Sequence, residues 1–169
     1  MIRPFDALAE SIAYQQLSGK AAATIWGRVR ALYPGKYLDP AAVLATPNEK
    51  LRAAGLSGSK TLALKDLAAK TIDGTVPTAR ALARMSDEEI IERLISVRGI
   101  GRWTVEMLLL FDLGRGDVWP VHDYGVRKGF AKVFGKRKLP TPKQLMKLGE
   151  KWRPYRSAAA WYFWRALDE

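Results

Sequence analysis

Two glycines separated by one apolar residue lie between two amphipathic segments, in Val97-Arg-Gly-Ile-Gly101. Glycine permits a tight turn and lets another backbone approach closely, and Ile100 can insert back into the core. The amide groups at the start of the next helix then point outward, where a phosphate oxygen can accept from them. Thr104 adds a hydroxyl group, and Arg98 and Arg102 add positive charge. A plain αα-corner uses similar glycines, but hydrophobe-x-Gly-hydrophobe-Gly, with Gly99 and Gly101, favours binding of a DNA backbone.

Several other kinds of site are excluded. The 169 residues contain no Cys and one His, His122, which excludes disulfides, thiolate zinc sites, iron–sulfur clusters and a cysteine nucleophile. No carboxylate or His cluster has the spacing of metal ligands, so a metal-dependent nuclease is poorly supported. Asp123 lies at the start of the helix expected after Pro120. On spacing alone, the simplest interpretation of Asp123 is a helix N-cap.

Positive charge is concentrated in the C-terminal third of the chain. The sequence has 28 Lys and Arg against 17 Asp and Glu, a net charge of +11. From 127 to 156 Glu150 is the sole acid, and the basic residues are Arg127, Lys128, Lys132, Lys136, Arg137, Lys138, Lys143, Lys147, Lys151, Arg153 and Arg156. Two sets spaced i, i+4 predict basic helix faces: Lys128, Lys132 and Lys136, and Lys143, Lys147 and Lys151. Like charges at this spacing destabilise an isolated helix, so a polyanion, most simply nucleic acid, is favoured over a solvated face.

The elements that must position these residues are predicted to be helices, since Ala and Leu dominate and strand-like alternation is absent. Caps and breakers predict helices from Pro4 to near Gly19, Lys20–Tyr33, two short ones begun by Asp39-Pro40 and Thr46-Pro47, Ser59–Asp73, one after the capping box Ser86–Glu89, Arg102–Asp112, Val121–Phe134, Pro142–Lys151 and Arg156–Leu167. The expected fold is all-α, one domain over residues 1–169 with a compact array of about ten short helices, containing a helix-hairpin-helix motif at about 90–112.

A membrane location is not expected. The longest apolar run, Ala158–Trp164, is far shorter than the ~20 residues of a membrane helix. No apolar signal segment follows Met1. We therefore expect an intracellular protein, in the cytoplasm with the nucleoid of a prokaryote or in the nucleus of a eukaryote. A monomer is the default expectation for a protein that must scan DNA.

Taken together, the sequence resembles the helix-hairpin-helix (HhH-GPD) superfamily of DNA glycosylases, specifically the 3-methyladenine DNA glycosylase II branch. Four blocks, in the family's order, carry the resemblance: SIAYQQLS (Ser11–Ser18), VRGIGRWT (Val97–Thr104), DVWPVHDY (Asp117–Tyr124) and KWRPYRS (Lys151–Ser157). The resemblance implies a DNA glycosylase fold of two helical lobes with the active-site cleft between them. Family members usually have additional helices, and some a β-domain, before the first block. Only ten residues precede it here, so we expect a minimal member or a truncated chain.

The resemblance assigns the catalytic carboxylate to Asp123, where it would stabilise an oxocarbenium-like sugar and orient or deprotonate water. Strand-cleaving relatives carry a Schiff-base lysine where this chain has Trp103. The implied activity is therefore a monofunctional glycosylase without lyase activity, acting on alkylated purines such as 3-methyladenine and 7-methylguanine in double-stranded DNA. These cationic bases would stack on Trp103 and Tyr155, with a cation–π gain of about 0.5–2 kcal/mol.

The resemblance also implies residues around the flipped nucleotide. Met107, one turn beyond Trp103, and Gln15 would line the base pocket, and Gln16 or, less favoured, Leu17 would enter the gap in the duplex. Ser18 and Lys20 would contact DNA. Glu106 is open to two interpretations, contact with a base edge or a salt bridge, and the role of His122 stays open. The other tryptophans are expected in the core or at its rim: Trp119, Trp152, Trp161 and Trp164.

No cofactor is expected to be required. Relatives bind a monovalent cation, Na⁺ or K⁺, through carbonyl oxygens of the hairpin, which by position would belong to Ile95, Val97 and Ile100. Two alternatives are weaker than a monofunctional glycosylase. A helix-hairpin-helix module that only binds DNA needs neither Asp123 nor an aromatic pocket, although an inactive sensor of alkylation damage would have both. A glycosylase-lyase is disfavoured by Trp103.

Overall fold

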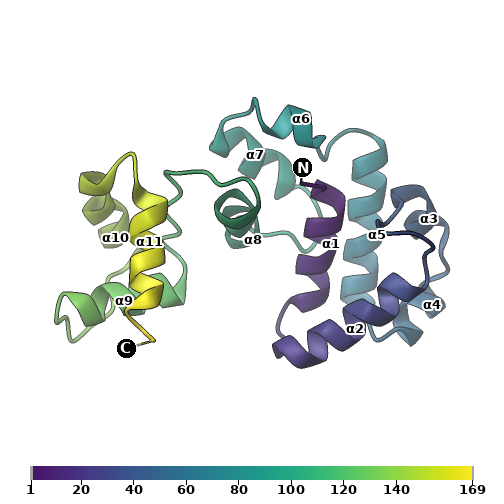
Figure 1. Ribbon diagram of the computed structural model, residues 1–169, viewed down its shortest axis with the longest axis horizontal. Coiled ribbons are helices and arrows are strands. Elements are labelled where there is room, and N and C mark those ends of the chain that lie inside the picture. Colours follow the sequence, from purple (N-terminus) through teal and green to yellow (C-terminus); the bar gives the residue numbers. More distant parts are fainter. Residues whose placement is uncertain (1, 169) are drawn as a thin grey trace. The chain divides into compact units, whose positions relative to one another are not determined.

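The computed structural model describes residues 2–168, and the chain divides into two compact units, Met1–Val105 and Glu106–Glu169. Every regular element in the described residues is helical, with eleven α-helices and no strand (Figure 1). The predicted all-α class is confirmed.

The first unit is organised around one central helix. Its elements are α1 (Pro4–Tyr14), α2 (Gly19–Ala31), α3 (Pro40–Ala45), α4 (Asn48–Ala53), α5 (Gly58–Ile72), α6 (Ala79–Leu82) and α7 (Asp87–Leu94). The longest, α5, packs against α1, α3 and α4, and α1 also packs against α2 (Figure 1). Aliphatic side chains that are almost fully buried fill the core, among them Leu8, Ile12, Leu64, Leu67 and Leu94.

The second unit is built on the packing of two helices. α8 (Arg102–Met107) crosses the division and continues as a π-helical turn (Leu108–Asp112). After it come α9 (Tyr124–Val133), α10 (Pro142–Gly149), a 3₁₀ turn (Glu150–Trp152) and α11 (Arg156–Arg165). α9 packs on α11 so closely that a Cβ at Gly129 would lie 2.0 Å from the Phe163 carbonyl oxygen. The core holds Trp119, Val121, Val126, Phe130, Leu145, Ala160 and Phe163.

Side-chain caps explain most helix starts. A Ser, Thr or Asp oxygen accepts a hydrogen bond from a first-turn amide, which satisfies a donor that the helix itself cannot. The capping residues are Ser18 (α2), Asp39 (α3), Ser57 (α5), Thr78 (α6), Ser86 (α7), Asp123 (α9) and Thr141 (α10). Most of the predicted helices therefore lie where the sequence puts them.

Several predicted boundaries are wrong. Thr46 ends α3 rather than capping α4, because its hydroxyl donates to the Ala42 carbonyl and accepts from Tyr33. The cap of α4 is Pro47, without a side-chain bond. α1 ends at Tyr14, before the predicted end near Ser18-Gly19, because Gln16 adopts a left-handed φ of 55°. α9 begins at Tyr124 rather than Val121 because Asp123 caps it, and the single-turn helix α6 was not predicted.

The two basic helix faces are shorter than predicted. α9 ends at Val133, before Lys136, and Gly135 has a left-handed φ of 58°. α10 ends at Gly149, so Lys151 lies in the 3₁₀ turn. Only the first two lysines of each set therefore share a helix. Among residues 2–168, no helix is long and apolar enough to cross a membrane.

Candidate functional site

The hairpin joins α7 to α8 through residues 95–101. Val97 and Ile100 are buried, and the Ile100 amide donates to the Val97 carbonyl at 3.1 Å. The predicted insertion of Ile100 into the core is confirmed. The amide of Val105 donates to the Gly101 carbonyl at 3.3 Å, which marks the first turn of α8. The loop therefore folds back on its own apolar side chains and leaves its glycines at the surface.

The two hairpin glycines serve different purposes. Gly99 has a left-handed φ of 77°, and a Cβ there would lie 3.0 Å from the Cβ of Ala63 on α5. The fold itself therefore requires glycine at this position. Gly101 is exposed, has no left-handed φ, and a Cβ would meet nothing within 4 Å. Nothing inside the chain demands a glycine at 101, which leaves close approach by an outside partner as its physical use.

Helix α5 holds the hairpin from behind through one carboxylate. Oδ2 of Asp66 accepts from the Arg98 amide at 2.7 Å and from Nζ of Lys70 at 2.9 Å. Lys70 also donates to the Ser96 carbonyl. Burial opposes ionisation of Asp66, but the hydrogen bonds from Arg98 and Lys70 outweigh it, so the pKa of this carboxyl lies below its usual value. These bonds fix the loop backbone at Ser96 and Arg98.

A second anchor comes from the segment after α1. Nε2 of Gln15 donates to the Gly99 carbonyl at 2.8 Å. Lys60 on α5 donates from Nζ to the carbonyls of Ala13 at 2.8 Å and Gln15 at 2.7 Å. Burial lowers the pKa of Lys60. The predicted base-pocket residue Gln15 thus has its amide nitrogen bound to the hairpin, which makes it a support of the loop.

The residues predicted to enter the gap in the duplex, Gln16 or Leu17, come next in the chain. Gln16 is exposed. Within residues 2–168 it is the one residue other than glycine that has a left-handed φ. Such backbone costs of order 1 kcal/mol and tends to persist at functional sites. Leu17 is an exposed large apolar side chain, and Ser18 caps α2 by accepting from the Ala21 amide at 3.4 Å. Lys20 is exposed in the first turn of α2.

The first turn of α8 carries the remaining predicted hairpin residues. Trp103 is 49% exposed, so a large aromatic face is open to a partner. Arg102 makes a two-pronged ion pair with Glu88, at 2.9 and 3.1 Å, and this hydrogen bonding lowers the pKa of Glu88. The charge of Arg102 is therefore already balanced. Thr104 is buried, and its predicted contact with phosphate stays a prediction.

In the second unit, Asp123 is held by two donors. Oδ1 accepts from the Val126 amide at 2.7 Å, as an N-cap, and from Nε1 of Trp164 at 2.8 Å. Asp123 is 9% exposed. A Cβ at Gly125 would lie 2.8 Å from Cδ1 of Trp164, so glycine there lets the indole approach α9. Phe111 stacks on the same indole with ring centroids 5.7 Å apart.

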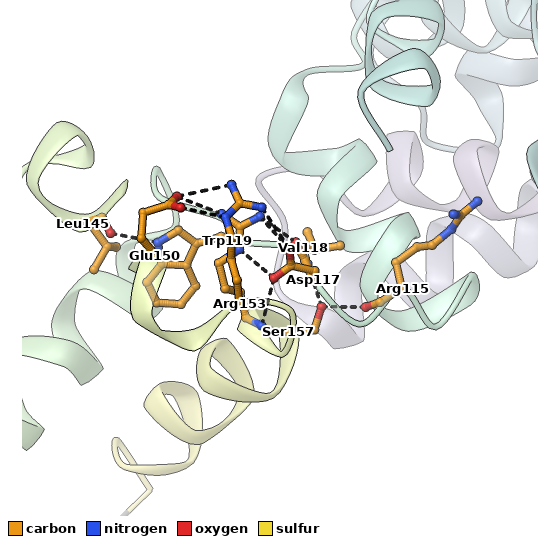
Figure 2. Close-up of polar contacts among 9 residues, drawn as sticks. Arg115, Asp117, Val118, Trp119, Leu145, Glu150, Arg153 and Ser157 are labelled. Carbon is orange, nitrogen blue, oxygen red and sulfur yellow. Dashed lines mark hydrogen bonds and ion pairs between the residues drawn. The ribbon is translucent and has the colours of Figure 1, made fainter. Parts of the chain in front are cut away.

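The irregular segment before Asp123, residues 115–118, is hydrogen-bonded to the start of α11 (Figure 2). Oγ of Ser157 donates to the Arg115 carbonyl at 2.6 Å and accepts from the Val118 amide at 2.9 Å. Asp117 accepts from Arg156 at 2.7 and 2.9 Å and from Arg153 at 3.1 Å. The hydrogen bonds from Arg156 lower the pKa of Asp117. The third and fourth sequence blocks are thereby joined.

Comparison with known proteins places the chain in a family. The model of the HhH-GPD superfamily of base excision DNA repair proteins matches residues 9–154. The chain belongs to this superfamily. It is 42% identical over 163 residues to DNA-3-methyladenine glycosylase 1 of Schizosaccharomyces pombe, covering 96% of this chain and 72% of that protein.

Solved structures of HhH-GPD proteins agree with this assignment. A structure of the S. pombe 3-methyladenine DNA glycosylase in complex with abasic DNA is 41% identical, with a TM-score of 0.85 over 96% of this chain and 80% of that one. A DNA-3-methyladenine glycosidase from Bacillus halodurans is 36% identical, with a TM-score of 0.90 over 98% and 76% of the two chains.

Tyr155 lies in an exposed aromatic hollow of the second unit of this HhH-GPD chain. Tyr155 is 71% exposed and lines a hollow of about 430 Å³ with other aromatic side chains, among them Phe134, Trp152 and Tyr162. Asp123 and Trp164 do not line that hollow. The aromatic residue that contacts the carboxylate is Trp164, and the role of Tyr155 in a base pocket stays a prediction.

The remaining residues considered from the sequence differ in their exposure to solvent. Met107 is half-buried at the end of α8, Glu106 is buried and His122 is exposed. No group of three or more His, Cys, Asp or Glu with the arrangement of a metal site occurs in residues 2–168.

Not all of the basic segment is available to a polyanion. Arg153 and Arg156 pair with Asp117 and Glu150 (Figure 2). Arg127 donates from Nε to the Pro140 carbonyl at 2.8 Å. These three arginines stabilise the second unit, and the positive charge that remains for an acidic partner is carried by the lysines of the segment and Arg137.

Sequence reasoning missed two positions that hold the candidate site. Trp164 lies in an apolar run typical of a core helix, and no local pattern connects it to Asp123, 41 residues earlier. Asp66 shows an i, i+4 pairing with Lys70, but its bond to the Arg98 amide spans 32 residues. Both roles depend on tertiary contacts.

Proposed function

We propose that this HhH-GPD protein is a monofunctional DNA glycosylase of base excision repair. It hydrolyses the N-glycosidic bond of alkylated purines, such as 3-methyladenine and 7-methylguanine, flipped out of double-stranded DNA. The observation that carries the proposal is the carboxylate of Asp123, buried and held by Val126 and Trp164 within a chain 42% identical to a named DNA-3-methyladenine glycosylase.

Asp123 supplies the reacting carboxylate. As the bond between C1′ of the sugar and the base breaks, its electron pair leaves with the base and positive charge develops on the sugar. A fixed carboxylate stabilises that charge, and it accepts a proton as a water oxygen bonds to C1′. Two donors on Oδ1 keep the group oriented before the substrate arrives. The products are a free base and an abasic site.

The leaving base needs little help when it is cationic. Cleavage turns an N-alkylated purine cation into a neutral base, so strong protonation by the protein is unnecessary. Trp103 offers an exposed aromatic face for such a cation, with Met107 beside it. Trp103 cannot form a Schiff base, so water is the nucleophile and no strand cleavage is expected.

The hairpin binds the DNA backbone. Gly101, the amides at the start of α8 and the exposed Arg98 serve the phosphates. Gln16, on its left-handed backbone, fills the gap left by the flipped nucleotide, with Leu17 beside it. Lys20 adds a phosphate contact from α2.

A monovalent cation, Na⁺ or K⁺, is proposed at the hairpin through the carbonyls of Ile95, Val97 and Ile100. The Val97 carbonyl already accepts from the Ile100 amide, and its second lone pair suits such a cation. We further propose that the protein acts as a monomer.

The test is chromatographic detection of bases released from N-methylated duplex DNA. The wild-type protein is expected to release methylpurines and to give no covalent adduct on borohydride reduction. An adduct would instead indicate a lyase. DNA binding without any release would favour the second candidate function, a non-catalytic sensor of alkylation damage, which the same hairpin and exposed Trp103 would serve.

A further inference from the structure

A hollow of about 890 Å³ lies in the second unit beside the end of α9, the following loop and α10. Part of its lining is apolar: Phe130, Leu139, Pro140 and Leu148. Phe130 and Pro140 are buried, whereas Leu148 is 39% exposed. A concave site with apolar lining and a few polar or charged groups is typical of a surface that binds another molecule. We call this hollow the basic groove, because Lys and Arg side chains form the rest of its lining.

Four cations complete the lining of the basic groove: Lys136, Arg137, Lys138 and Lys147. All four are exposed. The acid nearest in sequence, Glu150, is engaged by Arg153 and Arg156. No ion pair joins any of the four cations to an acid within residues 2–168. The groove therefore combines an apolar surface with uncompensated positive charge.

The loop that forms one wall of the groove is fixed before any partner binds. The Lys136 amide donates to the Ala131 carbonyl at 2.8 Å, and Arg127 donates to the Pro140 carbonyl at 2.8 Å. Thr141 and Gln144 form a reciprocal capping box at 2.9 and 3.2 Å. A preformed site loses less conformational entropy on binding than a mobile one.

We propose that the basic groove binds an acidic, amphipathic peptide segment of a partner protein. Its carboxylates pair with the four cations, and its apolar side chains cover Leu139 and Leu148. This inference is independent of the glycosylase activity, since none of the lining residues belongs to the hairpin or contacts Asp123.

Peptide fits the groove better than DNA does. A phosphate backbone supplies charge but no apolar surface, so it would leave the leucines in water. Nucleobases bind single-strand sites by stacking on aromatic faces, and the aromatic side chain of the groove, Phe130, is 4% exposed. An acidic segment with leucines satisfies both parts of the lining.

The test uses fluorescence anisotropy with a labelled synthetic peptide of about 14 residues, rich in Glu and Asp, with leucines at i and i+4. The control peptide has the same charges with serine at the two leucine positions. We expect the leucine peptide to bind at least about tenfold more tightly. Equal affinities would overturn the proposal, because charge alone would then account for binding.

Matched charge reversals locate the site. Lys138→Glu with Lys147→Glu should weaken peptide binding about tenfold or more. Lys128→Glu with Lys132→Glu, on exposed positions of α9 outside the groove, changes the net charge equally and should leave affinity within about threefold. Equal losses in both pairs would contradict the proposal. Leu148→Ser should abolish the preference for the leucine peptide.

Competition separates the two classes of partner. An unmodified DNA duplex in excess should not displace the peptide from the wild-type protein. Displacement that the Lys138→Glu, Lys147→Glu pair also abolishes would assign the groove to DNA and overturn the proposal.

Discussion

The hairpin in the first unit and the Asp123 region in the second are built on opposite principles. The hairpin presents backbone at the surface, and its polar side-chain supports lie behind it, on α5 and after α1. The Asp123 region presents one side chain, almost buried, with an indole and a backbone amide on its oxygen. A polyanion is bound by exposed donors on a stiff loop, whereas a developing sugar cation needs a desolvated, oriented carboxylate. We therefore expect substitutions in the hairpin to weaken DNA binding and substitutions around Asp123 to slow base release, each without the other effect.

Gly101→Asp should produce the largest loss of binding. A Cβ at this position has open space, so the fold is kept, while a carboxylate would repel the phosphates. The Kd for duplex DNA should rise about 10- to 100-fold, or about 1.4–2.8 kcal/mol. Unchanged affinity would mean that the hairpin does not bind phosphate.

Gly99→Ala is the contrasting control within the hairpin. The left-handed φ and the 3.0 Å contact with Ala63 predict a loss of stability of about 1–2 kcal/mol. Chemical denaturation would measure it.

Trp164→Phe should reduce base release while leaving DNA affinity within about twofold. The ring is kept, but Asp123 loses one of two donors on Oδ1. A hydrogen bond to a charged group contributes about 1.5–3 kcal/mol, so single-turnover release should slow by about tenfold or more. Trp161→Phe, on the exposed part of α11, is the matched control. Equal effects of both changes would remove Trp164 from the positioning of Asp123.

Asp66→Ala should weaken binding moderately, by about three- to tenfold, because the Arg98 amide and Lys70 lose their shared acceptor. Release at saturating DNA should stay within about twofold. A drop in that saturated rate without a change in Kd would show that the hairpin acts on the chemical step, and the separation of the two regions would be wrong.

Acid should weaken the attachment of the segment before Asp123. Arg156 lowers the pKa of Asp117 in the folded state, so this pair stabilises the fold fully above the usual carboxyl pKa. Its contribution of about 1–2 kcal/mol is lost as the pH falls through that value toward the folded pKa. Urea unfolding of the wild type and Asp117→Asn should therefore differ at pH 7, and the difference should shrink progressively as the pH falls below the usual carboxyl pKa. A constant difference would exclude this ion pair as the cause.

Local chemistry made much of the fold predictable. Ser86, Asp39 and Thr141 begin helices because their oxygens satisfy first-turn amides, and Ile100 is buried directly after Gly99, whose left-handed φ forms the turn. The wrong helix boundaries arose where one side chain could form either of two competing hydrogen bonds. Thr46 could cap α4 or bond within α3, and the Tyr33 hydroxyl favours the second arrangement.

The candidate site was predictable only in part. Asp123 could be identified as a cap from spacing and as a catalytic candidate from its sequence block, and the structure shows the cap directly. Trp164 and Asp66 could not be found, because each acts on a residue more than thirty positions away. Gln15 stays a predicted base contact, and its hydrogen bond to the Gly99 carbonyl could not be found from the sequence because it spans 84 positions.

Asp123→Asn, measured for both base release and DNA affinity, tests the central claim most directly. Asparagine keeps the N-cap, and its Oδ1 can still accept from Val126 and Trp164, while the negative charge is lost and the second oxygen becomes an amide nitrogen. Methylpurine release in a single turnover should fall about a thousandfold, while the Kd for methylated duplex stays within about twofold. Release near the wild-type rate, or an equal loss of binding, would contradict the assignment of Asp123 to chemistry.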